Sequence, residues 1–327
     1  MKKIILLISC ILIGFLAGFF ANALKERTTS IYGGVQIRQG GYAYINPLLE
    51  CDTGKDRSEK KIAPFKNSIE KYVNHKVKEE KIGDIAIYFR DLNNGLWFGI
   101  NEDYKFTPAS LLKLPLLIAY YKKAEQDNSI LKQSILFADG SLEQIIRQNI
   151  RPTNTLTYGQ SYTIDNLIKS MIVYSDNLAT QSLLEAIDSD FYNRVYEDMR
   201  IAIPDMKQDQ DYMSVKEYAS FFRMLFNGSY LTKEFSDRAL RLLAQVRPPD
   251  GIKGGVPKNI VVAHKFGERS IENSMTKQFH DCGIVYYPYH PYLLCIMTRG
   301  EDISKQENAI SEISHVVYQE VDSLHMD

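Results

Sequence analysis

The sequence predicts an α/β protein built on one sheet, with helices covering at least one of its faces. Three observations predict it. Two strand-like segments stand near the start of the regular elements, a block of helix-like segments follows over residues 122–245, and three longer apolar strand-like segments come after that block. The order is therefore helix, two strands, helical block, three strands and helix, with no internal repeat and no low-complexity segment.

Each regular element has its own signal in the sequence. A helix is expected from Ala63, because apolar residues then recur every four positions. Strands are expected at 84–92 and 96–100, joined by the hairpin signal Asn93-Asn94-Gly95. The three later strands are expected at 260–265, 278–287 and 292–298. A final helix is expected from Ser304, with a buried stripe at Ile310, Ile313, Val317 and Val321.

Length and composition describe an ordinary globular chain. The protein has 327 residues, of which 45% are hydrophobic and 24% are charged, enough for one large domain or two small ones. A formal net charge of −1 argues against a nucleic-acid partner.

Residues 1–23 have the pattern of an export segment. Lys2 and Lys3 precede an uncharged apolar run over residues 4–20, and small residues follow it. We therefore expect an exported, extracytoplasmic domain that is secreted after cleavage. The run is also just long enough to span a bilayer, so a membrane anchor that keeps the domain outside is the alternative.

The remaining cysteines and the segment after residue 23 carry weaker signals. Cys51, Cys282 and Cys295 are odd in number and not closely spaced, which fits neither a disulfide framework nor a zinc site, so we expect buried thiols. Residues 24–62 are rich in Gly, Lys, Asp and Glu and are expected to form a tether docked partly on the domain at residues 63–327.

The segment that begins at Thr107 carries the first chemical signal. Thr107 suits an N-cap and Pro108 the first helical position, and the apolar run that follows is too uniform for a surface helix. Ser110 and Lys113 are three residues apart and would share one face of this buried helix, with the serine in the first turn, where the helix dipole favours negative charge. We interpret Ser110 as a nucleophile and Lys113 as the acceptor of its proton, because burial favours the neutral amine. The alternative is a lysine that snorkels from the helix end.

Context distinguishes this pair from the other matches, and two further motifs accompany it. Ser-x-x-Lys occurs five times, and the other four pairs lie in polar, charged or turn-like surroundings. Ser175-Asp176-Asn177 interrupts a helix-like run where a polar loop can project. Lys265-Phe266-Gly267 ends an apolar strand, where a cation beside a glycine can hold a substrate whose backbone comes close. Taken separately, the second motif could be a helix cap and the third a strand-end charge.

With the three motifs in this order, residues 63–325 resemble the penicillin-recognising serine hydrolases, specifically their class A β-lactamase-like branch. That family carries Ser-x-x-Lys, Ser-Asp-Asn and Lys-Thr-Gly. The resemblance implies a five-stranded antiparallel sheet flanked by helices, plus an all-helical subdomain. It also implies a monomer that acts on a β-lactam or a peptidoglycan peptide and needs no metal or organic cofactor.

The resemblance implies a role for each matching residue. Ser110 is the acylated nucleophile, Lys113 is its proton acceptor or relay, and Ser175 passes the proton to the leaving nitrogen. The residues implied to bind substrate are Asn177 through the substrate amide, Lys265 through its charge, and Gly267 and Glu268, with an oxyanion hole formed by the backbone N–H groups of Ser110 and Glu268.

Two departures from the family pattern bear on function. Phe266 replaces a hydroxyl residue that helps to hold the substrate carboxylate. The Glu-x-x-Leu-Asn segment, whose glutamate activates the deacylating water, is missing, so deacylation is expected to be slow. In its place the region 188–214 offers Glu197, Asp205, Asp209 and Asp211, none with the neighbours of the missing glutamate, and we expect these carboxylates to be solvated. The alternatives are a cell-wall D,D-peptidase or penicillin-binding protein, and a non-catalytic module that binds peptidoglycan or a protein.

Overall fold

A computed structural model describes residues 36–51, 58–80, 82–137, 150–204, 211–270 and 275–325. Its centre is an antiparallel sheet with the strand order β4-β3-β11-β10-β9. These strands are β3 (Asp84–Asp91), β4 (Trp97–Ile100), β9 (Val262–Ser270), β10 (Lys277–Val285) and β11 (Tyr292–Gly300). The predicted five-stranded antiparallel sheet is confirmed.

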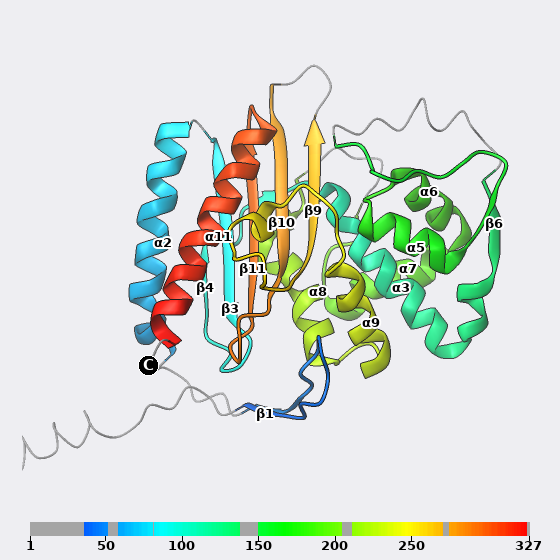
Figure 1. Ribbon diagram of the computed structural model, residues 1–327, viewed down its shortest axis with the longest axis horizontal. Helices are drawn as coiled ribbons and strands as arrows, with labels where there is room; N and C mark the ends of the chain where they lie inside the picture. Colours follow the sequence, from blue (N-terminus) through cyan, green and yellow to red (C-terminus); the bar gives the residue numbers. More distant parts are fainter. Residues whose placement is uncertain are drawn as a thin grey trace, which may run out of the picture.

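Helices cover both faces of the sheet. The first and last long helices, α2 (Ser58–Glu80) and α11 (Ile303–His325), lie side by side on one face, and α8 (Val215–Asn227) packs on the other (Figure 1). The predicted stripe of α11 is buried, with Ile310 and Val317 both fully inaccessible. Cover on both faces explains why successive residues of β10 and β11 are buried whichever face of the sheet they point to.

A group of helices lies beyond the β9 edge of the sheet (Figure 1). Its members are α3 (Lys113–Gln126), α5 (Ile164–Val173), α6 (Asn177–Ala186), α7 (Ser189–Met199) and α9 (Lys233–Leu243), with the short helices η1 (Ala109–Leu112) and η2 (Asn128–Lys132). The short helix α10 (Gly251–Gly254) packs against α11. Two pairs of very short strands were not predicted: β5 (Lys105–Phe106) with β8 (Met213–Ser214), and β6 (Ser134–Leu136) with β7 (Ser161–Thr163). Strands of two or three residues are too short to show alternation in a sequence.

The β3–β4 hairpin closes as its turn signal predicts. The backbone N–H of Asn93 and that of Asn94 both donate to Asp91 Oδ1, and Gly95 takes the left-handed backbone conformation with φ of 78°. Glycine adopts that conformation without steric cost, so the turn chemistry fixes the register of the strands on either side.

Two sequence expectations are wrong in this part of the fold. Cys282 and Cys295 are buried, as expected, but they form a disulfide and are not free thiols, because the antiparallel register of β10 and β11 places them directly opposite each other. Strand β9 runs to Ser270 and not to Lys265, because its polar end stays paired with β10 up to the Ser270–Lys277 pair. Lys265 therefore lies within the strand and does not end it.

The segment before α2 contacts helices α8 and α9. It contains the paired strands β1 (Gln36–Arg38) and β2 (Leu48–Cys51), and Ile45 between them is buried. The backbone N–H of Asn46 donates to the carbonyl of Phe226 at the end of α8, and that of Tyr44 donates to Asp237 in α9. The expected export segment at residues 1–23 lies outside the described residues. Within the described ranges, no helix is long and apolar enough to cross a membrane.

Candidate active site

Ser110 lies on a tight turn and not in a regular first helical turn. Residues 109–112 form the 3₁₀ helix η1, and Ala109 before the serine takes a left-handed conformation with φ of 51°. Thr107 is not the N-cap that the sequence suggests, because its hydroxyl donates to Asp211. The turn still leads into the buried helix α3, and it leaves Ser110 half-exposed while Lys113 is 3% exposed. A left-handed non-glycine residue immediately before a half-exposed serine is the kind of strained backbone that often marks a functional site.

The amine of Lys113 lies among polar groups of the Ser-Asp-Asn loop. It donates to the backbone carbonyl of Ser175 at 2.6 Å, to Ser175 Oγ at 3.1 Å and to Asn177 Oδ1 at 2.6 Å. The described contacts include no hydrogen bond from Lys113 to the Ser110 hydroxyl. Burial, and then the charge of Lys265, lower the pKa of Lys113 well below its ordinary value. A lysine in this environment can act as a proton acceptor, and the snorkelling interpretation does not fit its burial.

Lys265 approaches the same serine from the sheet. Its side chain is fully buried, and its amine donates to Ser175 Oγ at 3.0 Å and to the carbonyl of Phe266 at 2.9 Å. Burial lowers the pKa of Lys265 to about 7, against the opposing charges of Asp281 and Glu268. Ser175 Oγ is therefore held between two amines, which suits a hydroxyl that relays a proton.

The Ser-Asp-Asn loop both caps a helix and contributes side chains to the site, so the two interpretations of its motif hold together. Helix α5 ends at Val173 and α6 begins at Asn177, so the motif interrupts the helical run as predicted, although its last residue already belongs to α6. Asp176 caps α6 by accepting from the backbone N–H groups of Leu178 and Ala179 at 2.8 and 3.1 Å, and burial raises the pKa of its carboxyl. Ser175 itself takes a left-handed backbone conformation with φ of 55°, and both it and Asn177 contact Lys113.

Gly267 allows β9 to pack directly against the Ser110 turn. A Cβ atom at this position would lie 2.7 Å from the carbonyl oxygen of Pro108 and 3.0 Å from the backbone nitrogen of Leu111. Glycine is therefore required for this close approach. Phe266 is buried with its ring stacked on Phe279, and Lys265 Nζ lies 4.0 Å from the ring centroid. Phe266 therefore presents an aromatic face at the position where the family pattern has a hydroxyl.

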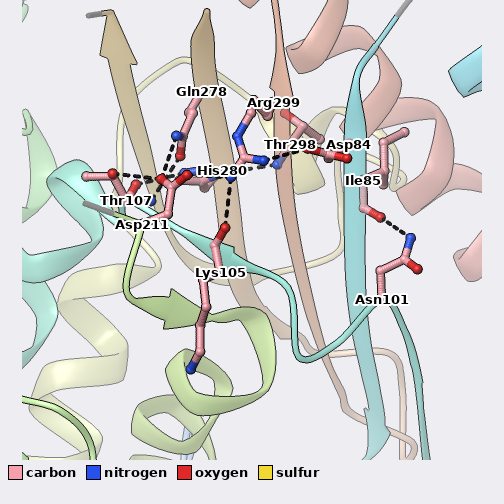
Figure 2. A network of polar contacts seen from close by, with 10 residues as sticks. All are labelled: Asp84, Ile85, Asn101, Lys105, Thr107, Asp211, Gln278, His280, Thr298 and Arg299. Atoms are coloured by element: carbon pink, nitrogen blue, oxygen red, sulfur yellow. Dashed lines mark hydrogen bonds and ion pairs between the residues drawn. The ribbon is translucent and has the colours of Figure 1, made fainter. Parts of the chain in front are cut away.

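A polar network fixes the chain that leads into the Ser110 turn (Figure 2). Asp211 Oδ1 accepts from Thr107 Oγ1 at 2.9 Å and from Gln278 Nε2 at 2.9 Å, and Gln278 Oε1 accepts from the backbone N–H of Thr107 at 3.0 Å. Arg299 donates to Asp211 Oδ2 at 2.6 Å and to the carbonyl of Lys105 at 2.8 Å. The Asp211 carboxylate thereby joins Thr107, which follows β5, to β10 and β11.

His280 completes this network as a neutral residue. Its Nδ1 accepts from the backbone N–H of Thr298 at 3.2 Å, so its Nε2 carries the proton and donates to the carbonyl of Thr107 at 3.0 Å. Burial lowers the pKa of His280 to about 4, which keeps the ring uncharged near neutral pH. The histidine supports the segment before Ser110 without adding charge to it.

The four loop carboxylates have different surroundings. Asp211 is exposed, as expected of a solvated loop carboxylate, but the network also holds it in place. Asp205 and Asp209 lie outside the described residues. Glu197 is exposed on α7, next to Asp198, which accepts from the hydroxyl of Tyr230. The carbonyl of Tyr230 accepts from Lys122, nine residues and about 13 Å along α3 from Lys113.

The structure thus gathers the predicted residues in one place. Hydrogen bonds join Lys113, Ser175, Asn177 and Lys265, and Gly267 packs on the turn that carries Ser110. Sequence reasoning missed the network around Asp211, although polar residues inside apolar strands, such as Gln278, were a signal for it. Among the described residues, no group of three His, Cys, Asp or Glu side chains is placed to hold a metal ion.

A model of the β-lactamase enzyme family matches residues 64–321 of this sequence. The chain belongs to the β-lactamase enzyme family. Among its curated relatives, β-lactamase VEB-1 of Pseudomonas aeruginosa is 22% identical over 268 residues, which cover 74% of this chain and 86% of that protein. β-Lactamase SME-1 of Serratia marcescens is 23% identical over 267 residues, covering 76% and 87% of the two chains.

Solved structures of β-lactamases and of a penicillin-binding protein share the fold of this β-lactamase-family chain. TLA-3 extended-spectrum β-lactamase superposes with a TM-score of 0.67 and 20% identity, covering 79% of this chain and 98% of that one. PBP-A superposes with a TM-score of 0.65 and 20% identity, covering 78% and 96%. The fold is therefore that of the β-lactamase and penicillin-binding protein superfamily, as predicted.

Proposed function

We propose that this chain is an exported serine hydrolase that opens a β-lactam or a D-alanyl amide through an acyl-enzyme on Ser110. The observation that carries the proposal is the placement of Ser175 Oγ 3.1 Å from the amine of Lys113 and 3.0 Å from that of Lys265, beside the turn of a half-exposed serine. Family membership supports hydrolase chemistry, and the lowered pKa of Lys113 supports its role as the base.

The proposed acylation step moves one proton and exchanges one bond. Neutral Lys113 accepts the hydroxyl proton of Ser110 as Ser110 Oγ bonds to the substrate carbonyl carbon. The C–N bond then breaks, and Ser175 delivers a proton to the leaving nitrogen while it regains one from Lys113. Asn177 and Lys265 orient the substrate, and the backbone N–H groups of Ser110 and Glu268 bind the oxyanion.

The second step is proposed to be slow. Hydrolysis of the Ser110 ester needs a water that a base deprotonates, and neither Asp211 nor Glu197 is placed to be that base. Asp211 accepts from Thr107, Gln278 and Arg299, and Glu197 is exposed on α7. A penicillin-binding protein or D,D-peptidase is therefore the second candidate, and it is favoured by the structural likeness to PBP-A, a point mutant of which was solved as an acyl-enzyme complex with penicillin G.

A fluorescent penicillin tests the proposal and separates the alternatives. A covalent band that fades on a scale of minutes supports a slow hydrolase, and a band that persists indicates the penicillin-binding protein. No covalent band, together with no consumption of penicillin, would leave only a non-catalytic binding module. Export is tested separately, by comparing the N-terminal sequence of the mature protein with residue 24 onward and by fractionating membranes. A full-length chain in the cytoplasm would contradict export.

A further inference from the structure

Glu268 places a carboxylate beside the two lysines of the site. It follows Gly267, the residue whose backbone packs on the Ser110 turn. Its charge raises the pKa of Lys113 and of Lys265, opposing the burial that lowers both. The side chain is therefore near enough to both amines to weaken the positive potential that they create.

The carboxylate of Glu268 is also held in place. Its Oε1 accepts from the backbone N–H of Ile150 at 2.6 Å, which links β9 to the chain that precedes α5. Its Oε2 is buried and has no hydrogen-bond partner among the described residues. Leaving a buried carboxylate oxygen unpaired costs free energy, and a ligand that offers a hydrogen-bond donor or a positive charge would recover it.

At the position of Phe266 the family pattern has a hydroxyl residue that helps to bind the substrate carboxylate, and this chain lacks that hydroxyl. The buried ring of Phe266 carries none, and the amine of Lys265 faces that ring while donating to Ser175 and to the Phe266 carbonyl. A substrate carboxylate that approaches Lys265 would meet an aromatic face and the charge of Glu268. Like charges disfavour binding and slow association.

We propose that Glu268 is a specificity-determining residue that favours acyl donors with a neutral or cationic group next to the scissile amide nitrogen, and slows the acylation of Ser110 by donors with a carboxylate there. The inference rests on the proposed function, because it concerns donors that acylate Ser110. It goes beyond the oxyanion role of the backbone at this residue, because it assigns a role to the side chain.

The test compares two probes that share one lactam ring. Benzylpenicillin carries a carboxylate beside the lactam nitrogen, and its methyl ester is neutral there. Mass spectrometry gives the second-order rate of adduct formation with each probe. Glu268→Gln removes the charge but retains an oxygen that can accept from Ile150, so we expect the rate ratio of acid to ester to rise about 10-fold at low ionic strength and less in salt. Glu197→Gln, an equal change of charge on exposed α7, should leave the ratio unchanged.

Three results would overturn the proposal, and they differ from one another. A ratio that Glu268→Gln does not change shows that its charge selects nothing. An unchanged ratio with a longer-lived adduct makes Glu268 a deacylation base instead. Failure of both probes to label the native protein removes the proposed function itself, together with the inference that rests on it.

Discussion

The hydroxyl of Thr107 donates a 2.9 Å hydrogen bond to Asp211 across 104 residues of the chain. Thr107 is three residues before Ser110, and Asp211 also accepts from Gln278 and Arg299 of the sheet (Figure 2). The backbone N–H and carbonyl of Thr107 are bonded as well, to Gln278 and His280. The position of the serine turn therefore depends on contacts that lie outside the three motifs.

Asp211→Asn tests this dependence. The amide keeps the shape of the carboxylate but loses its charge, and its NH2 group would face a hydrogen-bond donor where the carboxylate has an acceptor oxygen. We therefore expect the free energy of unfolding to fall by about 1–3 kcal/mol. Acylation of Ser110 should also slow, because its turn is less well held. Denaturant unfolding and the rate of labelling by a penicillin measure the two effects. Asp103→Asn, at an exposed carboxylate 3.7 Å from Lys216, should change stability by less than about 0.5 kcal/mol. Equal effects in the two variants would contradict a positioning role for Asp211.

Ser110→Ala tests the nucleophile. Ser110 is the half-exposed serine on the turn before α3, so its removal should abolish covalent labelling by an activated acyl probe while the melting temperature stays within a few degrees of the native value. Ser129→Ala is the matched control, because Ser129 belongs to another Ser-x-x-Lys pair, in η2. Labelling that persists in Ser110→Ala would refute the assignment.

Lys113→Arg tests whether the buried lysine is a base. Acylation needs the neutral amine, so its rate should fall as the pH drops through the lowered pKa of Lys113. Arginine keeps a positive charge but cannot release a proton at accessible pH. We therefore expect Lys113→Arg to acylate at least 100-fold more slowly than the native protein, close to Lys113→Ala. A native rate in the arginine variant would show that Lys113 is only a structural cation.

Much of the fold could be predicted because its signals are local. The turn chemistry of Asn93-Asn94-Gly95 sets the first hairpin, and apolar periodicity sets the buried face of α11. The burial of Lys113 followed from the leucines around it. Each of these features depends on residues within a few positions of one another.

The features that the sequence did not reveal depend on distant partners. Gln278 accepts a hydrogen bond from the backbone of Thr107 across 171 residues, and the residues next to either partner in the sequence do not predict this contact. The Cys282–Cys295 disulfide needs the strand register, which counting cysteines cannot supply. The left-handed residue Ala109 likewise lies on a turn that packs against Gly267 of β9, whereas local propensity alone predicted a regular helix start.

The last prediction concerns the fate of the acyl-enzyme. A positioned general base is worth about 100- to 10,000-fold in rate, and neither Asp211 nor Glu197 is placed to supply one. Deacylation should therefore limit the turnover of penicillins, so that stopped-flow traces show a burst followed by a slow steady state. Mass spectrometry after brief mixing should detect the intact adduct on Ser110. Glu197→Gln should leave both phases unchanged, because Glu197 is exposed on α7 and its neighbour Asp198 accepts from Tyr230, whose carbonyl accepts from Lys122, nine residues along α3 from Lys113. Rapid consumption of penicillin without an adduct would show that another base acts on the water, and an adduct trapped only in Glu197→Gln would identify that base.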